Sequence, residues 1–239
     1  MIIGEGISKI YNKGKPNEFV ALKNINITLR DAELLAITGE SGAGKSTLLH
    51  ILSGIEKAET GKVEIDTLQL SEMSDNELSH LRNTILGIVW QDFALLDNFT
   101  ASENVMLPLY FSRNTYRERR FKVSEAIERV GITGLANKPV RYLSRGQKQR
   151  VAIARAIVNN PKYLFADEPT GALDSKTASD ILDLFKSLNR QGMGIIIVTH
   201  NELVANICNK IIRLNDGEMI SEQKAISHKV LKGAFNNEN

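Results

Sequence analysis

Apolar runs of strand length alternate with helix-length amphipathic segments along most of the chain. Three of these runs, at positions 34–37, 163–166 and 195–198, contain almost no polar residue. Uninterrupted runs of this length are typical of strands that are buried on both faces of a parallel sheet. The first two precede segments with helical periodicity, so the pattern predicts an α/β fold with a mostly parallel sheet.

Two segments near the N-terminus, 2–7 and 19–29, have a strand pattern and flank a polar turn at 12–16. In the second segment, apolar and polar residues alternate imperfectly, as in an antiparallel pair with one face in water. The sequence therefore predicts an N-terminal antiparallel β-subdomain. Further short strands are expected at 61–65, 86–90, 211–214 and 218–220, the last two joined as a hairpin by a turn that contains Asn-Asp-Gly.

Strand patterns disappear between about 92 and 143. The segments 102–109 and 116–130 have helical periodicity instead, so we expect a helical subdomain inserted into the α/β body. Capping residues mark three further helices, beginning near Ser74, Ser144 and Asp174. We expect one domain over residues 1–222, with the insertion at about 92–143, followed by a polar C-terminal tail at 223–239.

Composition narrows the classes of protein that this chain can belong to. It has 239 residues, of which 42% are hydrophobic, and a net charge of only +2, so the totals show no nucleic-acid footprint. The single cysteine, Cys208, excludes an intramolecular disulfide and is expected to be a small buried hydrophobe. No apolar run approaches the roughly 20 residues needed to cross a bilayer, and the N-terminus lacks a signal-peptide pattern. We expect a soluble chain that acts at a membrane only through a partner.

The segment from Gly39 to Thr47, GESGAGKST, has the spacing G-x-x-x-x-G-K-[ST] between a predicted buried strand and a predicted helix. The backbone N–H groups of such a loop and the helix N-terminus together form a socket for phosphates. Lys45 can reach the β- and γ-phosphate oxygens, and the Ser46 hydroxyl can ligate Mg²⁺. A glycine-rich turn that ends in Lys-Ser by chance is the competing interpretation, and the flanking strand and helix weigh against it.

Hydrolysis of a nucleoside triphosphate also needs a carboxylate for the metal, a base for the water and a sensor for the γ-phosphate. Candidates follow predicted strands, and open parallel sheets place their sites at the carboxyl ends of the strands. Asp167 can hold Mg²⁺, and the adjacent Glu168 can polarise the attacking water. Gln91 and His200 follow two other predicted strands. Each of these residues alone is more simply explained as part of a polar turn or as a structural side chain.

The segment 143–156, LSRGQKQRVAIARA, resembles the signature segment of ABC-type ATPases, in which LSGGQ precedes a helix. It follows GESGAGKST and precedes LFADEPTGALD. With these three motifs in this order, the chain from about 2 to 220 resembles the nucleotide-binding subunit of an ABC transporter. The resemblance implies a P-loop NTPase core with ATP and Mg²⁺ as ligands. It also implies hydrolysis of ATP to ADP and phosphate, coupled to transport.

The resemblance implies a role for each residue that matches a family motif. Tyr11 stacks on the adenine, and the phosphates are held by Gly39, Glu40, Ser41, Gly42, Ala43, Gly44, Lys45, Ser46 and Thr47. The implied signature and D-loop residues are Ser144, Gly146, Gln147 and Asp174. The implied catalytic residues are Glu168 as general base, His200 as the switch histidine, Lys45 and Gln91, and the implied Mg²⁺ ligands are Ser46, Gln91 and Asp167. The chain departs from the family at Arg145, which replaces the first signature glycine and bears on ATP affinity or rate.

The segment 95–109, LLDNFTASENVMLPL, resembles the branch of the family that serves lipoprotein release, macrolide export and antimicrobial-peptide resistance. This implies a second ABC subunit in a homodimer, an integral membrane permease as partner, a cytoplasmic location at the inner face of the membrane, and no nucleic acid. The permease would export a peptide, lipid or drug, or transmit force across the membrane. The alternative is a soluble ABC ATPase without a transport role, for example in cluster assembly.

Overall fold

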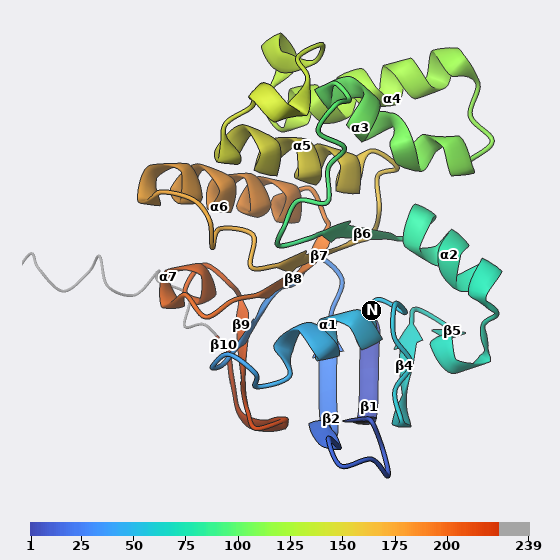
Figure 1. Cartoon of the computed structure of the whole chain (residues 1–239), viewed down its shortest axis with the longest axis vertical. Coiled ribbons are helices and arrows are strands. Elements are labelled where there is room, and N and C mark those ends of the chain that lie inside the picture. Colours follow the sequence, from blue (N-terminus) through green and yellow to red (C-terminus); the bar gives the residue numbers. More distant parts are fainter. Residues whose placement is uncertain (225–239) are drawn as a thin grey trace, which may run out of the picture.

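The computed structural model describes residues 1–224 and arranges their strands in two sheets (Figure 1). The smaller sheet contains β1 (Ile2–Tyr11), β2 (Phe19–Leu29), β4 (Thr60–Ile65) and β5 (Leu68–Gln69). The larger contains β3 (Leu34–Thr38), β6 (Leu86–Val89), β7 (Tyr163–Asp167), β8 (Gly194–Val198), β9 (Lys210–Asn215) and β10 (Glu218–Lys224). The smaller sheet is antiparallel in the order β2-β1-β4-β5. The larger has the order β10-β9-β3-β8-β7-β6, and only β10 runs antiparallel to its neighbour. The predicted α/β class, with its N-terminal antiparallel part, is confirmed.

The helices are α1 (Lys45–Leu52), α2 (Asp75–Thr84), α3 (Ala101–Met106), α4 (Tyr116–Arg129), α5 (Arg145–Ile157), α6 (Ser175–Arg190) and α7 (Glu202–Ala205). Short 3₁₀ turns are η1 (Leu70–Glu72), η2 (Leu107–Phe111), η3 (Thr133–Leu135) and η4 (Val140–Tyr142). The side chains of Ser74, Ser144 and Asp174 cap α2, α5 and α6, as their sequence positions predicted. The single helix expected at 102–109 is instead α3 followed by η2, because Pro108 has no N–H to extend the α-helical hydrogen bonds.

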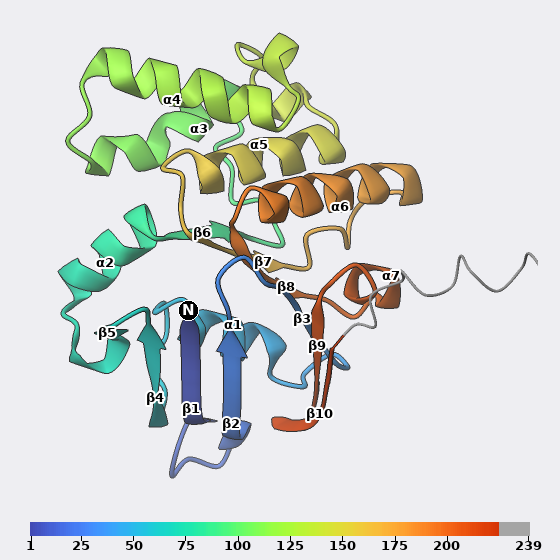
Figure 2. The same cartoon turned by 180° about the vertical axis from the view of Figure 1, so that it is seen from behind.

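The central strands β3, β7 and β8 of the larger sheet are buried on both faces, which explains their uninterrupted apolar sequences. In β3, Leu34 and Ala36 belong to the core beneath α5 and α6, whereas Leu35 and Ile37 belong to the core around α1. Helix α1 lies between the two sheets, and the other helices cover the opposite face of the larger sheet or its edge (Figures 1 and 2). Both faces of each central strand therefore contribute to burial, as is typical of parallel sheets.

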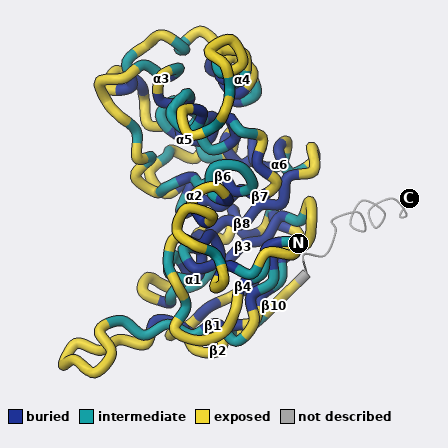
Figure 3. Tube along the Cα trace, turned by 90° about the vertical axis from the view of Figure 1, so that its right-hand side faces the viewer, coloured by how far each residue is buried: buried dark blue, intermediate teal, exposed yellow. Residues whose placement is uncertain are grey.

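The segment 92–143 contains α3, α4 and 3₁₀ turns and no strand of either sheet. Helices α3 and α4 pack on α5 at one end of the molecule, and their outer surfaces are largely exposed (Figure 3). The division of the chain into an α/β body with a helical insertion remains a prediction. At the C-terminal end, β10 continues to Lys224, past the boundary predicted at residue 222, and the rest of the predicted tail lies outside the described residues. Within residues 1–224, no helix has the length and apolar character needed to span a bilayer.

Gly87 on β6 allows the sheet and α5 to approach each other closely. A Cβ added at Gly87 would lie 2.4 Å from the carbonyl oxygen of Ala156 and 2.9 Å from Cδ1 of Leu164. The first of these atoms belongs to the backbone of α5 and cannot rotate away. The distance between β6 and α5 therefore depends on the absence of a side chain here.

Replacing this glycine tests the importance of that contact. We expect Gly87→Ala to lower the free energy of unfolding by about 1–3 kcal/mol, because overpacking forces backbone shifts. Urea denaturation would measure the change. Gly134→Ala is the matched control, since a Cβ added there meets no atom within 4 Å. Equal denaturation midpoints for the two variants would contradict the prediction.

Candidate functional site

The phosphate loop connects the buried strand β3 to the N-terminus of α1, as the sequence predicted. Gly44 caps α1 with a φ of 94°, a conformation that L-residues rarely adopt. A Cβ on Gly44 would also lie 2.4 Å from the carbonyl oxygen of Ala21 in β2. Both constraints require glycine, and they leave the first N–H groups of α1 free to face a ligand.

Lys45 is the first residue of α1 and is only 8% exposed. Its Nζ donates hydrogen bonds to the carbonyl oxygens of Gly39 and Glu40, at 3.0 and 2.7 Å. Within residues 1–224, no carboxylate lies within ion-pair distance of this ammonium group, although it is largely withdrawn from water. A buried cation without a counter-ion favours the binding of an anion beside it.

Ser46 and Asp167 meet at the carboxyl end of β7. The Ser46 hydroxyl donates a hydrogen bond to Oδ1 of Asp167 at 3.2 Å, and Asp167 is 7% exposed. Burial raises the pKa of the Asp167 carboxyl, and the Ser46 hydrogen bond acts in the opposite direction. A hydroxyl beside a carboxylate is a partial set of hard oxygen ligands, which suits Mg²⁺ when a substrate supplies the remainder. The described residues contain no group of three or more His, Cys, Asp or Glu side chains that could hold a metal unaided.

Glu168 faces His200 across two neighbouring strands. Glu168 follows β7 and His200 lies just after β8, so the parallel pairing of these strands brings the two residues together. Oε1 of Glu168 is 2.8 Å from Nδ1 of His200, and the hydroxyl of Thr199 donates to Oε2 at 3.4 Å. Glu168 has a φ of 45°, a strained value for a residue with a side chain. The carboxylate is thus held by contacts on both oxygens.

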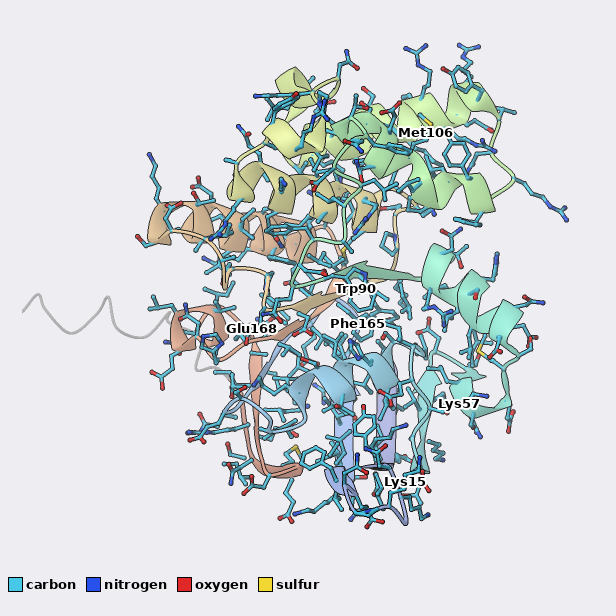
Figure 4. The ribbon with its side chains drawn as sticks, viewed as in Figure 1. Lys15, Lys57, Trp90, Met106, Phe165 and Glu168 are labelled. Atoms are coloured by element: carbon cyan, nitrogen blue, oxygen red, sulfur yellow. The ribbon has the colours of Figure 1, made fainter. Side chains whose placement is uncertain are left out.

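These groups line one open cleft of about 1200 Å³. The predicted residues that line it are Glu40, Ser41, Gly42, Gly44, Lys45, Ser46, Thr47, Gln91, Asp167, Glu168 and His200. Trp90 and Glu168 mark the cleft near the middle of the molecule, between the helical end and the antiparallel sheet (Figure 4). A cleft of this size, with a cation, carboxylates and helix N–H groups, can accommodate a polyphosphate and its attached nucleoside.

Tyr11, Gly39 and Ala43 are predicted site residues that do not line the cleft. The Tyr11 hydroxyl donates to Oε2 of Glu56 at 2.7 Å and accepts from the Thr47 hydroxyl at 3.4 Å, so the tyrosine lies beside the phosphate loop. The cleft is also lined by residues that the sequence did not suggest: Phe19, His50, Asp92, Gly171 and Ala172. Phe19 is 52% exposed at the start of β2. The signal in the sequence that could have pointed to Phe19 is an aromatic residue shortly after a polar turn.

The predicted signature residues lie apart from this cleft. Ser144, Gly146 and Gln147 are at the N-terminus of α5, and Asp174 is at the N-terminus of α6. The two helix ends meet at Thr177. A Cβ added at Gly146 would lie 2.3 Å from Cγ2 of Thr177, and the carboxylate of Asp174 accepts hydrogen bonds from the N–H and the hydroxyl of Thr177. The side chains of Ser144 and of its neighbour Arg145 are exposed. Within residues 1–224, the signature residues and Asp174 do not line the cleft that holds the phosphate loop.

A guanidinium from α5 holds the segment that follows Gln91. Phe93 and Ala94 both have positive φ values, 64° and 46°. Arg155 donates hydrogen bonds to the carbonyl oxygens of both, at 2.7 Å for Phe93. Burial lowers the pKa of the Arg155 guanidinium, and nearby Asp92 acts in the opposite direction. Two strained residues in succession are thus stabilised by one buried cation.

Comparison with known proteins relates this cleft to one family. The ABC transporter family profile matches residues 22–171. The ABC transporter ATP-binding protein YvrO of Bacillus subtilis is 42% identical and covers 95% of this chain and 100% of its own length. The lipoprotein-releasing system ATP-binding protein LolD 1 of Rhodopseudomonas palustris is 40% identical over 90% of this chain and 96% of its own. A dimeric structure of the ATP-binding cassette MJ0796 of Methanocaldococcus jannaschii, bound to ADP and Pi, has a TM-score of 0.87 at 41% identity, over 95% of this chain and 99% of that one.

Removing the Arg155 guanidinium tests its hold on the segment after Gln91. We expect Arg155→Met to lower the free energy of unfolding by about 2–3 kcal/mol, since two carbonyl groups lose a charged donor. The emission of Trp90, the only tryptophan, should shift as the strand end beside it loosens. Arg150→Met is the control, because Arg150 on the same helix donates to the Val130 carbonyl, away from the cleft. An identical emission shift in both variants would contradict the prediction.

Proposed function

The chain belongs to the ABC transporter family as one of its ATP-binding subunits, which are ATPases, and from this premise we propose that it dimerises on ATP and drives a separate membrane permease. The observation that carries the proposal is the meeting of Ser46 with Asp167 and of Glu168 with His200 around a single phosphate loop. A metal-binding pair and an oriented carboxylate beside a phosphate socket are the parts that triphosphate hydrolysis needs.

The protein binds ATP, and we assign the phosphates to the loop from Gly39 to Thr47 and the N-terminus of α1. Lys45 would exchange its contacts with the Gly39 and Glu40 carbonyls for the β- and γ-phosphate oxygens. The adenine would stack on Tyr11, which is half-buried beside the loop with the Lys9 ammonium 5.3 Å from its ring centroid. Phe19 provides an exposed ring along the cleft, and an aromatic ring can stack on a planar base.

The ligand set of this cleft fits Mg²⁺. Ser46 and Asp167 would hold the ion, and Gln91 at the rim of the same cleft would complete the protein ligands. When bound, Mg²⁺ would supply positive charge to offset the negative charge that develops on the phosphates. The 3.2 Å contact between Ser46 and Asp167 shows that these two oxygens already lie together.

Glu168 is assigned as the general base. Its carboxylate would accept a proton from the attacking water while that water bonds to the γ-phosphorus and the bond to ADP breaks. His200 and Thr199 hold the carboxylate from either side, so little motion is needed to align it. His200, which lines the same cleft, would sense the γ-phosphate.

The signature residues are assigned to the nucleotide of a second copy of the chain. Ser144 and Asp174 are exposed at the N-termini of α5 and α6, whereas Gly146 is buried and Gln147 is half-buried. None of these residues lines the cleft of its own chain. A C₂ dimer would bring each signature surface to the other subunit's phosphate loop, twice by symmetry. MJ0796, a related cassette, is dimeric in its structure. Arg145 would then add a cation near the partner's phosphates.

A groove of about 660 Å³ beside α2 and η2 is the proposed contact with the permease. Its walls include Leu107, Pro108 and Phe111 from η2 and Trp90 from the strand end next to Gln91.

The similarity to a lipoprotein-releasing protein supports a role in transport at the inner face of the membrane, over the alternative of a soluble cluster-assembly ATPase. The permease would export a lipid, peptide or drug, or would transmit force across the membrane. The proposal keeps the ATPase domain at 1–222 with its helical insertion at about 92–143, and the tail at 223–239.

Replacing the proposed base tests the chemistry. We expect Glu168→Gln to bind ATP but to hydrolyse it at least about 10²-fold more slowly, because general-base contributions are of that size. The variant should also form a stable dimer in ATP, since the nucleotide that joins the subunits is no longer consumed. Phosphate release and size-exclusion chromatography would measure the two effects. Glu202→Gln, just after His200 but outside the cleft lining, is the matched control. A hydrolysis rate near that of the control would remove Glu168 from the role.

Mixing two inactive variants tests whether the site is composite. Lys45→Ala removes the main cation of the phosphate loop, and Ser144→Arg obstructs the signature surface. In a mixed dimer, one site receives both lesions and the other receives neither. Random mixing makes roughly half of the dimers mixed, so about a quarter of all sites should be intact. Phosphate release from the mixture should therefore exceed the sum of the two parents.

A lack of recovery would identify a different arrangement. If tag pull-down shows mixed dimers and phosphate release does not recover, the site is built within one chain or the two sites act only together. Wild-type subunits paired with Lys45→Ala distinguish these cases. The dimer of a wild-type and a Lys45→Ala subunit has one intact site, and this site fails to hydrolyse ATP only if both sites must act together.

A further inference from the structure

Residues 110–122 form a projecting corner of the molecule that we call the basic tip. It comprises the end of η2, the connecting loop and the first turns of α4. It contains five basic residues and one acidic residue, whereas the whole chain has a net charge of only +2. The rest of the chain is therefore slightly acidic, and the positive charge is concentrated at this corner. The basic residues are Arg113, Arg117, Arg119, Arg120 and Lys122.

Large aromatic side chains are exposed among these charges. Phe111 is 82% exposed, Phe121 is 71% exposed, and Tyr110 and Tyr116 are also exposed. Single exposed hydrophobic residues are common, but four rings within thirteen residues form a patch. Such a patch beside positive charge marks a surface with a partner.

No cation of the tip lies within ion-pair distance of a carboxylate in the described residues, although Lys122 is close enough to Glu118 to attract its carboxylate. Within the described part of the chain, none of the five basic side chains takes part in an ion pair. Arg119 lies over the Tyr110 ring at 5.0 Å and Arg120 over the Tyr116 ring at 6.0 Å, so the rings support the guanidinium groups without neutralising them. The one carboxylate, Glu118, is used locally, where it accepts a bond from the Thr115 N–H at the start of α4.

The tip adjoins the groove assigned to the permease. Phe111 belongs to both, because it lines the groove and lies at the start of the tip. The turn from η2 to α4 and helix α2 are on the same side of the molecule (Figure 1), and Met106, just before η2, marks that side in Figure 4. If the permease occupies the groove, the membrane in which it sits lies on the side that the tip faces.

We propose that the basic tip binds the anionic phospholipid headgroups of the membrane that contains the permease. The inference rests on the proposed function, because it needs the subunit to work at a membrane. Arginines attract anionic headgroups over about a Debye length, and phenylalanine and tyrosine rings favour the headgroup boundary. The tip combines both kinds of side chain on one exposed corner, so it can touch the lipid surface beside the docked permease.

A lipid surface fits the tip better than a protein partner does. A protein segment of fixed shape is held by a concave site, and the groove next to the tip already supplies one. The most exposed rings of the tip protrude from the end of η2 and from the outer face of α4, where they meet a broad surface rather than a cavity. Arginines without ion-pair partners on such a corner can bind the many phosphate groups of a lipid surface, and this binding does not depend on one fixed arrangement of the phosphates.

Vesicle sedimentation tests the proposal with the full chain. Vesicles of phosphatidylglycerol and phosphatidylcholine in equal parts should sediment the protein at low salt, and vesicles of phosphatidylcholine alone should not. We expect Arg117→Gln with Arg120→Gln to lower the partition coefficient by about fivefold per residue, or roughly 25-fold together. Phe111→Ser should weaken the binding that persists at high salt, because that part is apolar.

Lys15→Gln with Lys57→Gln is the matched control, since it removes two charges from exposed positions far from the tip (Figure 4). An equal loss in this control, or no sedimentation of wild-type protein with anionic vesicles, would overturn the proposal. Permease capture that depends on Arg117 and Arg120, without vesicle binding, would assign the tip to the permease instead. ATP hydrolysis and ATP-dependent dimerisation of the same preparations report separately on the proposed function. The variant with Arg117→Gln and Arg120→Gln should retain both, because these two residues line neither the cleft nor the groove.

Discussion

The parallel pairing of β3, β8 and β7 is the constraint on which the rest of the structure depends. Ala36 pairs with Ile197, and Ile197 pairs in turn with Ala166, so the three strands end at one edge of the sheet. The phosphate loop follows β3, Asp167 is the last residue of β7 with Glu168 next to it, and His200 is two residues after β8. A slip of one residue in either pairing would turn every side chain of that strand to the other face. The two separate cores above and below the sheet make such a slip costly, so the register of the cleft is fixed by burial.

The electrostatics of the cleft are incomplete without a ligand. Lys45 is buried with only carbonyl oxygens around its ammonium group, and Asp167 is buried with a raised carboxyl pKa. Both groups lose hydration in the fold and recover little of it from their neighbours. In the proposed function, a magnesium-bound triphosphate would supply an anion to the first and a cation to the second. The folded chain would then bind such a ligand with charges already in place and with little reorganisation.

The sequence predicted the parts of the site that depend on local spacing. Lys45, Asp167 and His200 each follow an apolar strand, and strand ends in a parallel sheet share one edge. Phe19 and Arg155 escaped prediction because their roles depend on packing between segments far apart in the chain. Phe19 reaches the cleft only because α1 lies between the two sheets, and Arg155 contacts the segment after Gln91 only because α5 crosses β6. Pro108 is visible in the sequence, but the helical periodicity continues through it and therefore favours one longer helix than α3.

Helix α5 links two functions through its two ends. Its first turn carries the signature residues, and its last turn carries Arg155, which holds the backbone beside Gln91. Its 13 residues span about 20 Å as one helix, and the interior of a well-formed helix changes length very little. In the proposed dimer, one end touches the nucleotide of the partner and the other borders the nucleotide of its own chain. If α5 moves as a rigid body, a displacement of one end by one nucleotide would produce a displacement of similar size at the other end. The two sites could then communicate through rotation of α5 as a whole, without a series of side-chain rearrangements.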